Sequence, residues 1–178
     1  MRQEVRPLTA GEIDLARSVF GDAIDLAPVR VVLGKWAFFQ PRGVVMSPRG
    51  RIHFHPHGTA YRDDFSHAEL SEQGLFVHEM VHIWQHQSGI FLPLRRVPWA
   101  RYDYAVKPGW ELRRYGIEQQ AEIVRHAFLL GHNASIPGAP PLRQLKTILP
   151  FRAVHEHGND MPSPLVGEGC ADLGSSEP

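Results

Sequence analysis

Two histidines four residues apart constrain this chain more than any other feature. Residues 78–82 read His78-Glu79-Met80-Val81-His82. On an α-helix, residues i and i+4 lie on one face, so both imidazoles can reach one metal ion and Glu79 can reach a water molecule bound to it. The spacing therefore predicts a helix, with His78 and His82 as metal ligands and Glu79 as a catalytic base.

The flanking residues favour a helix that is anchored in a core. Ser71 is a suitable N-cap, and Gly89 is a suitable stop. Apolar residues surround the motif and supply surface for burial: Phe76, Val77, Met80, Val81, Ile83 and Trp84. The alternative is a pair of histidines on the surface of an amphipathic helix, which would hold no metal.

A catalytic zinc ion usually takes three protein ligands, and the nearest histidine cannot be the third. A helix rises about 1.5 Å per residue, so His78 and His86 would lie about 12 Å apart along the axis, too far for one ion. The metzincin continuation is also missing, because Gln85 and Ser88 stand where that pattern has a glycine and its third histidine. The third ligand must come from another part of the chain.

A second amphipathic stretch, residues 116–131, offers candidates for that ligand. Glu118 and Glu122 lie four residues apart on one face, where like charges repel each other unless cations lie opposite. A metal ion and the N–H of a metal-bound histidine would be such partners. The alternative is a solvated acidic face. His126 and Glu111 are the remaining candidates if Glu118 is not a ligand.

At these residues the chain resembles the gluzincin metallopeptidases, whose HExxH helix is followed by a helix carrying Glu-x-x-Ala-Asp or a close variant. Here that motif reads Glu118-Gln119-Gln120-Ala121-Glu122. The resemblance implies that Glu118 is the third ligand of one Zn²⁺ ion and that Glu122 orients a ligating histidine, His78. Glutamate at the last place departs from the pattern by one methylene.

The resemblance extends from about Leu8 to Phe151. Stretches at 16–22, 34–36 and 74–80 are similar to bacterial proteins labelled vgr-related, which are small metallopeptidase domains associated with the spike proteins of type VI secretion. This similarity implies a peptide or protein substrate and a secretion-spike protein as a partner.

Length and composition set the limits of the fold. With 178 residues, 43% of them hydrophobic, the chain can bury a core as one domain. We expect this domain to span 1–154, and we expect 155–178, rich in Gly, Pro and Ser, to be disordered. The formal net charge of zero gives no case for binding nucleic acid or a membrane surface. A single cysteine, Cys170, excludes an intrachain disulfide.

Targeting signals are missing from the sequence. No apolar run approaches the roughly 20 residues that a spanning helix needs, and the N-terminus has no signal-peptide pattern. We therefore expect synthesis in the cytoplasm and, if the protein is exported, a specialised secretion machine.

The remaining elements predict an α+β order. Thr9 and Glu12 form a capping box for a helix that runs up to Gly21, and 29–33 reads as a buried strand. Residues 44–46 and 51–55 read as a hairpin around a type I turn at 47–50. Residues 141–149 read as a short closing helix. This is the order of a zincin-like domain, in which two helices pack with a small, mainly antiparallel sheet.

Three further groups leave alternatives open. His53, His55 and His57 alternate along a strand, which favours a polar strand face or an edge for an extended peptide over a second metal site. The segment 95–114 mixes basic and aromatic residues and reads as a solvated connecting loop rather than a grip for substrate or nucleic acid. Two tyrosines of this segment and one directly after it are candidates to donate a hydrogen bond to an oxyanion: Tyr102, Tyr104 and Tyr115.

The sequence thus predicts a zinc-dependent metallopeptidase that hydrolyses peptide bonds. Zinc would activate a water molecule, and Glu79 would take its proton. One competing hypothesis is a zinc-stabilised binding module that docks on a secretion apparatus with little or no turnover. Another is a toxin or effector whose peptidase activity is released after delivery. Intact Glu79 favours an enzyme, because a structural site needs no base.

Overall fold

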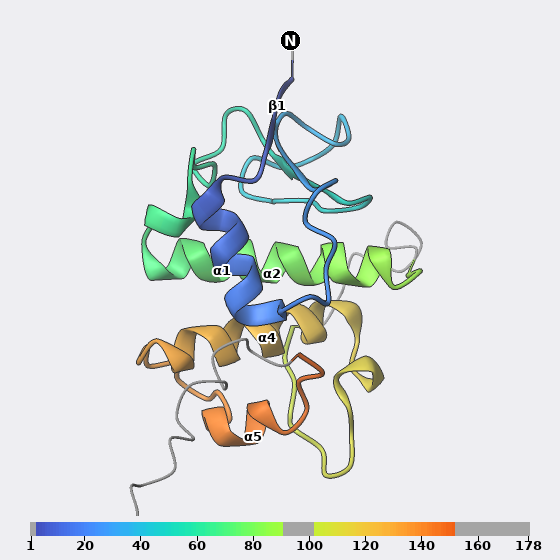
Figure 1. The fold of residues 1–178 in the computed structure, drawn as a ribbon, viewed down its shortest axis with the longest axis vertical. Helices are drawn as coiled ribbons and strands as arrows, with labels where there is room; N and C mark the ends of the chain where they lie inside the picture. Colours follow the sequence, from blue (N-terminus) through green and yellow to red (C-terminus); the bar gives the residue numbers. More distant parts are fainter. Residues whose placement is uncertain (1–2, 91–101, 152–178) are drawn as a thin grey trace, which may run out of the picture.

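Strands gather at one end of the molecule and helices at the other (Figure 1). The computed structural model describes residues 3–90 and 102–151. In chain order the elements are β1 (Glu4–Pro7), α1 (Ala10–Phe20), β2 (Arg30–Leu33), β3 (Arg51–Phe54), the 3-10 turn η1 (Phe65–His67), α2 (Leu70–Gln87), the 3-10 turn η2 (Leu112–Arg114), α4 (Ile117–Gly131) and α5 (Leu142–Lys146). Arg95, Arg96, Arg101, Cys170 and the segment 155–178 lie outside the described residues.

The three strands form a mixed sheet in the order β1-β2-β3. β1 runs antiparallel to β2, and β2 runs parallel to β3. The prediction of a mainly antiparallel sheet is therefore wrong. The reason is the connection over residues 34–50, which returns to the starting end of β2 before β3 begins. The sequence patterns also missed β1, whose four residues are too few to show a period.

The predicted hairpin is reduced to a single bridge. Met46 and His53 exchange backbone hydrogen bonds of 3.1 and 2.8 Å, and this isolated pair replaces the expected ladder. The buried side chain of Gln40 explains the loss, because its Nε2 donates to the carbonyl oxygens of Val44 (2.8 Å) and His53 (3.0 Å). A side-chain amide thus occupies an acceptor that a second strand would have used.

The predicted capping box at the start of α1 is confirmed. The Thr9 side chain accepts from the Glu12 amide at 3.0 Å, and the Glu12 carboxylate accepts from the Thr9 amide at 3.0 Å. The same carboxylate is fully buried and accepts two 2.8 Å bonds from Arg6, on β1, and one of 3.1 Å from the Phe65 amide. Glu12 therefore ties β1, α1 and η1 together.

A stack of aromatic rings joins the sheet to α2. Phe65 lies between Phe54 of β3 and Phe76 of α2, with ring centroids 5.3 and 5.4 Å apart. α2 begins at Leu70, not after Ser71 as predicted, and its N-cap residue is Glu69. The side chain of Gln73 fixes the earlier start, because it donates to the carbonyl oxygen of Ala68 at 2.9 Å. Gly89, with a φ of +84°, follows the helix end as expected.

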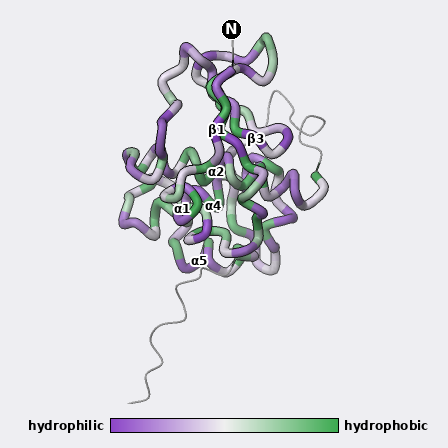
Figure 2. Tube along the Cα trace, turned by 45° about the horizontal axis from the view of Figure 1, so that its top comes forward, coloured by the Kyte–Doolittle hydropathy of each residue, from purple (hydrophilic) through white to green (hydrophobic). Residues whose placement is uncertain are grey.

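α2 and α4 lie side by side across the middle of the molecule (Figure 1). Hydrophobic residues recur along the helices at this centre (Figure 2). α5 is shorter than the predicted 141–149 and ends at Lys146, because the Ile148 amide donates to the carbonyl oxygen of Leu145 (3.1 Å) and the carbonyl oxygen of Gln144 accepts the Thr147 hydroxyl instead (2.8 Å). Among the helices within 3–90 and 102–151, none has the length and apolarity to cross a membrane. The fold is a small mixed α+β domain; a zincin-like fold stays a prediction.

Replacing Glu12 tests the junction of sheet and helix. We expect Glu12→Ala to lower the free energy of unfolding by about 3 kcal/mol, because it leaves the Arg6 guanidinium and two backbone amides without their acceptor. Chemical denaturation would measure the change, with Glu4→Ala on exposed β1 as the control. A loss of less than about 1 kcal/mol would show that the junction does not depend on this carboxylate.

Candidate metal centre

α2 carries the two histidines of the HExxH motif into the interior. Its apolar residues next to the motif, Val77, Met80 and Val81, are fully buried, so the helix is fixed in the core on one side. His78 and His82 lie on its other side, facing α4, with ring centroids 5.0 Å apart. Both side chains are buried, and His82 has no exposed surface. The core thus holds the pair rigidly.

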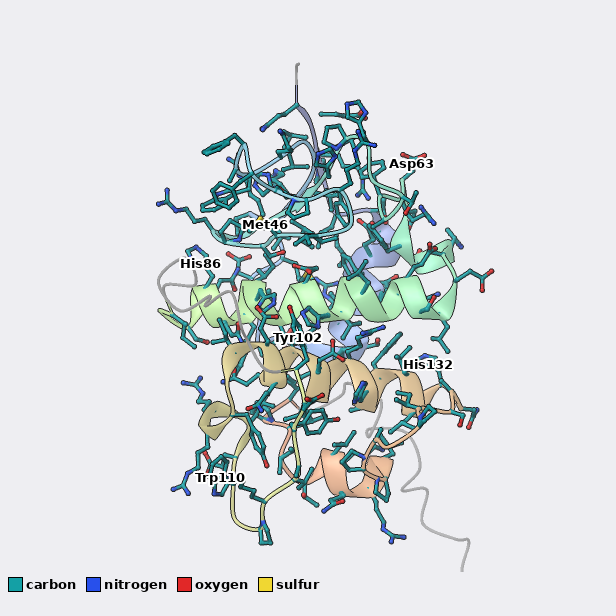
Figure 3. All side chains as sticks on the ribbon, turned by 180° about the vertical axis from the view of Figure 1, so that it is seen from behind. Met46, Asp63, His86, Tyr102, Trp110 and His132 are labelled. Atoms are coloured by element: carbon teal, nitrogen blue, oxygen red, sulfur yellow. The ribbon has the colours of Figure 1, made fainter. Side chains whose placement is uncertain are left out.

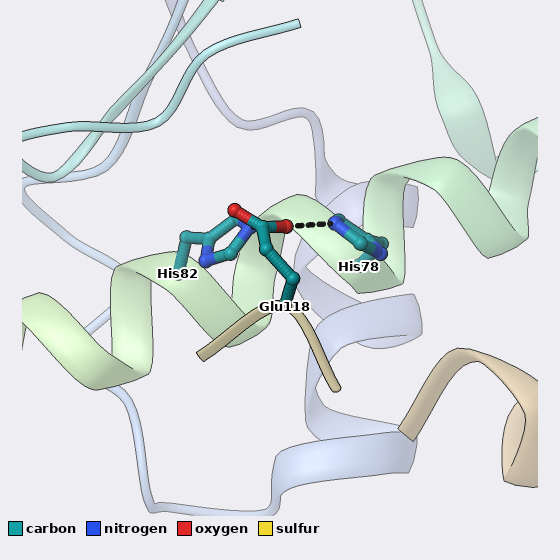
Figure 4. Close-up of side chains that lie close together, drawn as sticks. All are labelled: His78, His82 and Glu118. Atoms are coloured by element: carbon teal, nitrogen blue, oxygen red, sulfur yellow. Dashed lines mark ion pairs between the residues drawn. The ribbon is translucent and has the colours of Figure 1, made fainter. Parts of the chain in front are cut away.

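Glu118, in the first turn of α4, completes a group of three (Figure 4). Its Oε2 lies 3.4 Å from Nε2 of His78 and 3.2 Å from Nε2 of His82. The three candidate ligand atoms all lie within 4.8 Å of one another. One ion could therefore reach all three at the ligand distances of about 2 Å that zinc requires.

The donor set fits a metal ion. Nε2 of His82 is buried and has no hydrogen-bond partner within the described ranges. A buried polar atom without a partner is costly, and metal coordination would satisfy it. Two imidazole nitrogens and one carboxylate oxygen are a common set for catalytic zinc, which keeps a fourth position for water or substrate. The structure thus brings the three predicted residues together; metal binding itself stays a prediction.

The other nitrogen of each histidine is fixed by an oxygen acceptor. Nδ1 of His78 lies 2.9 Å from Oε1 of Glu122, the residue predicted to orient it. Nδ1 of His82 lies 2.8 Å from Oε1 of Gln85. A proton on each Nδ1 leaves the Nε2 lone pairs directed at the shared position. When Nε2 carries no proton, both imidazoles are therefore in the tautomer that a metal needs.

These orienting residues are held in turn. Gln85 donates to the carbonyl oxygen of Ile117 at 2.9 Å and to the side chain of Gln120 at 3.0 Å, so it joins α2 to the start of α4. Glu122 lies 3.2 Å from Nε2 of His126, whose Nδ1 lies 2.7 Å from the Tyr104 hydroxyl. Sequence patterns missed Gln85, although its place three residues after His82 was a usable signal.

Electrostatics reinforce the His78–Glu122 contact. Burial lowers the pKa of His78, but hydrogen bonds to Glu118 and Glu122 and the charge of Glu79 outweigh it and raise this pKa to about 9. Burial raises the pKa of Glu122, but the hydrogen bonds to His126 and His78 outweigh it and hold this pKa well below its usual range. In the metal-free protein at neutral pH, the pair is therefore a cation beside an anion.

Glu79 is separate from the group of three. It is buried, and its Oε2 accepts a hydrogen bond of 2.6 Å from Ser47, which is also buried. Ser47 belongs to the loop before β3, so Glu79 faces the sheet side of α2 rather than α4. The sequence pattern predicted Ser47 only as the first residue of a turn. The hydrogen bond from Ser47 fixes Oε2 of Glu79 and leaves Oε1 as the oxygen that could accept a proton.

The three candidate tyrosines have different surroundings. The Tyr104 hydroxyl contacts His126, and the Tyr115 hydroxyl accepts a hydrogen bond of 2.9 Å from the Lys107 amide. Tyr102 stacks near His78, with ring centroids 6.4 Å apart, and is 52% exposed. Figure 3 shows it where α2 and α4 face each other. Of the three, Tyr102 is the one placed beside a candidate ligand.

The other candidate residues lie apart from the group of three. His86 is half-buried near the end of α2, next to Gly50, and Glu111 is exposed. His53 is buried with Nδ1 3.3 Å from the carbonyl oxygen of Gly34, so β3 does not present the predicted polar face. His55 and His57 pack on each other with ring centroids 5.7 Å apart. The reason for this correction is that both faces of β3 are covered, because the consecutive residues Ile52, His53 and Phe54 are all buried.

Comparison with known proteins places the chain in a family. It is 43% identical over 134 residues to the type VI secretion system spike protein VgrG2b of Pseudomonas aeruginosa, a match that covers 70% of this chain and 13% of the spike protein. The solved effector domain of P. aeruginosa VgrG2b superposes with a TM-score of 0.68 and 37% identity, over 80% of each chain.

The chain belongs to the family of VgrG2b effector domains. No family model matches it. The chain spans only about an eighth of the spike protein's length, so the relationship concerns the effector domain and not the spike as a whole. The predicted vgr-related family is thereby confirmed.

Glu118 provides the first test of this candidate metal centre. We expect the protein to hold about one Zn²⁺ per chain and Glu118→Ala to weaken zinc binding by more than about 100-fold, beyond the usual effect of losing an outer partner. Elemental analysis and competition with a chelator would measure this. Glu111→Ala, which removes an exposed glutamate apart from the group of three, should leave zinc binding unchanged. If Glu118→Ala keeps full affinity, the third ligand is Glu122 or His126.

A second prediction concerns the protons that zinc binding releases. Between pH 6.5 and about 9 the metal-free protein keeps a proton on His78 that an unfolded histidine would lose. Coordination of a metal ion by Nε2 must displace this proton. Zinc binding at neutral pH should therefore release about one proton from His78, and apparent affinity should rise with pH up to about 9. Calorimetry in buffers of different ionisation enthalpy would measure the release. Binding heats independent of the buffer would contradict it.

Proposed function

We propose that this effector domain is a zinc-dependent metallopeptidase. The observation that carries the proposal is the pairing of a three-ligand group with a carboxylate that is not part of it. Structural zinc sites are usually closed by four protein ligands, whereas His78, His82 and Glu118 are three. Glu79 comes from the same helix as the histidines and is held apart from them by Ser47. That arrangement suits hydrolysis.

Each residue has a role in the proposed reaction. His78, His82 and Glu118 would hold one zinc ion, with Glu122 and Gln85 fixing the histidines. When bound, zinc supplies Lewis acidity, which lowers the pKa of water and polarises a carbonyl group. Every further step belongs to side chains of the chain itself.

Glu79 would move the proton. Its Oε2 is occupied by Ser47, so Oε1 accepts a proton from the attacking water as the water oxygen bonds to the carbonyl carbon. The same oxygen then gives the proton to the amide nitrogen as the carbon–nitrogen bond breaks. Tyr102, beside His78, would donate a hydrogen bond to the carbonyl oxygen as it gains negative charge.

One observation favours the alternative of a zinc-stabilised binding module. The candidate ligands and Glu79 are almost completely buried, with 3% of Glu79 and none of His82 exposed. A site without access would stabilise the fold but turn over nothing. Cleavage activity, measured beside metal content, separates these two functions.

The family relationship also supports a proposal about context. The matched relative is a type VI secretion spike protein, so we expect this domain to associate with such a spike and to be exported by that machine. Its substrate would then be a peptide or protein met after delivery. Co-purification with a spike protein would test the association independently of catalysis.

Replacing Glu79 tests the enzyme directly. We expect Glu79→Gln to keep zinc and the fold but to lose roughly 10²- to 10⁴-fold in the rate of peptide cleavage, because the amide cannot accept the proton. A peptide-library assay on zinc-loaded protein would measure it. Glu111→Gln, an exposed glutamate outside the site, is the matched control.

Two outcomes would contradict the proposal. Equal cleavage by Glu79→Gln and the parent protein would exclude this carboxylate as the base. Full zinc occupancy in a parent protein that cleaves no peptide in the library would favour the binding module.

A further inference from the structure

A loop at the sheet end of the molecule exposes large apolar side chains. In the loop 34–44, Phe38 is 89% exposed and Phe39 62%, and Trp36 and Val44 are also exposed. The two phenylalanine rings contact each other edge to face, 5.2 Å apart, rather than turning into the core. Neither the metal centre nor the proposed reaction uses these four residues, which we call the apolar tip.

The loop is well fixed despite this exposure. The buried Gln40 accepts from the Trp36 amide at 2.8 Å and donates to the carbonyl oxygens of Val44 and His53. The Lys35 ammonium donates to the carbonyl oxygen of Phe38 at 3.0 Å. A buried side chain thus anchors the backbone from within while the rings point outward. Such preorganisation lowers the entropy cost of binding through the rings.

Two cations, Lys35 and Arg42, belong to the same loop as the apolar tip. From residue 26 to residue 62 the sequence contains no aspartate or glutamate, and its cations are Arg30, Lys35, Arg42, Arg49, Arg51 and Arg62. Desolvation lowers the pKa of His55, and the positive charges of Lys35, His57 and Arg42 lower it further, so both loop cations act near β3. Glu4, on neighbouring β1, is exposed. The overall net charge of zero is therefore compatible with two cations and no carboxylate within the loop that carries the apolar tip.

We propose that the apolar tip, with the cations Lys35 and Arg42 beside it, docks this domain on an anionic lipid surface. Aromatic side chains settle at the boundary of headgroups and acyl chains, and nearby lysine or arginine side chains pair with anionic headgroups. Shallow insertion of this kind needs no spanning helix. The arrangement would keep a peptidase near substrates at a membrane, although docking itself does not depend on the peptidase proposal.

The experiment is co-sedimentation of the full chain with phosphatidylcholine vesicles that contain or lack phosphatidylglycerol. The parent protein should bind the anionic vesicles at least tenfold more strongly than the neutral ones. Phe38→Ser with Phe39→Ser should weaken binding at least tenfold, and Arg42→Glu should reduce the preference for anionic vesicles. Lys146→Glu, the same charge change on exposed α5 at the opposite end, is the matched control.

The replaced side chains are exposed and make no hydrogen bond to Gln40, so thermal unfolding should be unchanged and the variants remain informative. Failure of the parent protein to bind anionic vesicles would overturn the proposal, as would unchanged binding by the double serine variant. A dimer of the parent protein that the serine variant cannot form, without vesicle binding, would assign the apolar tip to a second copy of the chain instead. None of these outcomes bears on Glu79 or on zinc.

Discussion

The packing of α2 against α4 depends on a row of buried polar contacts that neither helix could satisfy alone. His78 meets Glu122 across the interface, and Gln85 links His82 to Gln120 and to the backbone of Ile117. A buried polar group without a partner is costly, so these contacts fix the register of the two helices. The position of Glu118 beside both histidines follows from that register.

The two sides of α2 serve different purposes. One side turns toward α4 and carries the candidate ligands, while Glu79 turns toward the loop before β3 and meets Ser47. Because His78 and Glu79 are adjacent in sequence, they are rotated by roughly 100° from each other around the helix, and their side chains meet different neighbours. The sheet and its loops therefore contribute to the site although they supply none of the three candidate ligands.

Helical features were predictable from the sequence because their signals are local. The capping box of Thr9 and Glu12, the amphipathic stretch of α4 and the HExxH spacing each lie within a few turns. Other contacts join residues that only the tertiary fold brings together. Examples are the parallel pairing of β2 with β3, the hydrogen bond from Gln40 to the carbonyl oxygen of Val44, and the hydrogen bond from Ser47 to Glu79. Net charge is also a coarse signal, because a total of zero averages over segments such as 26–62, which contains six lysines and arginines and no carboxylate.

Gly74 leaves room for α2 and α4 to pack closely. It lies one turn before His78, and a Cβ atom there would lie 3.0 Å from the side chain of Leu129 on α4. An alanine would fit only if that flexible side chain moved aside, and a larger residue would demand a larger movement. The spacing of the two helices that carry the candidate ligands therefore depends in part on a residue outside the HExxH motif.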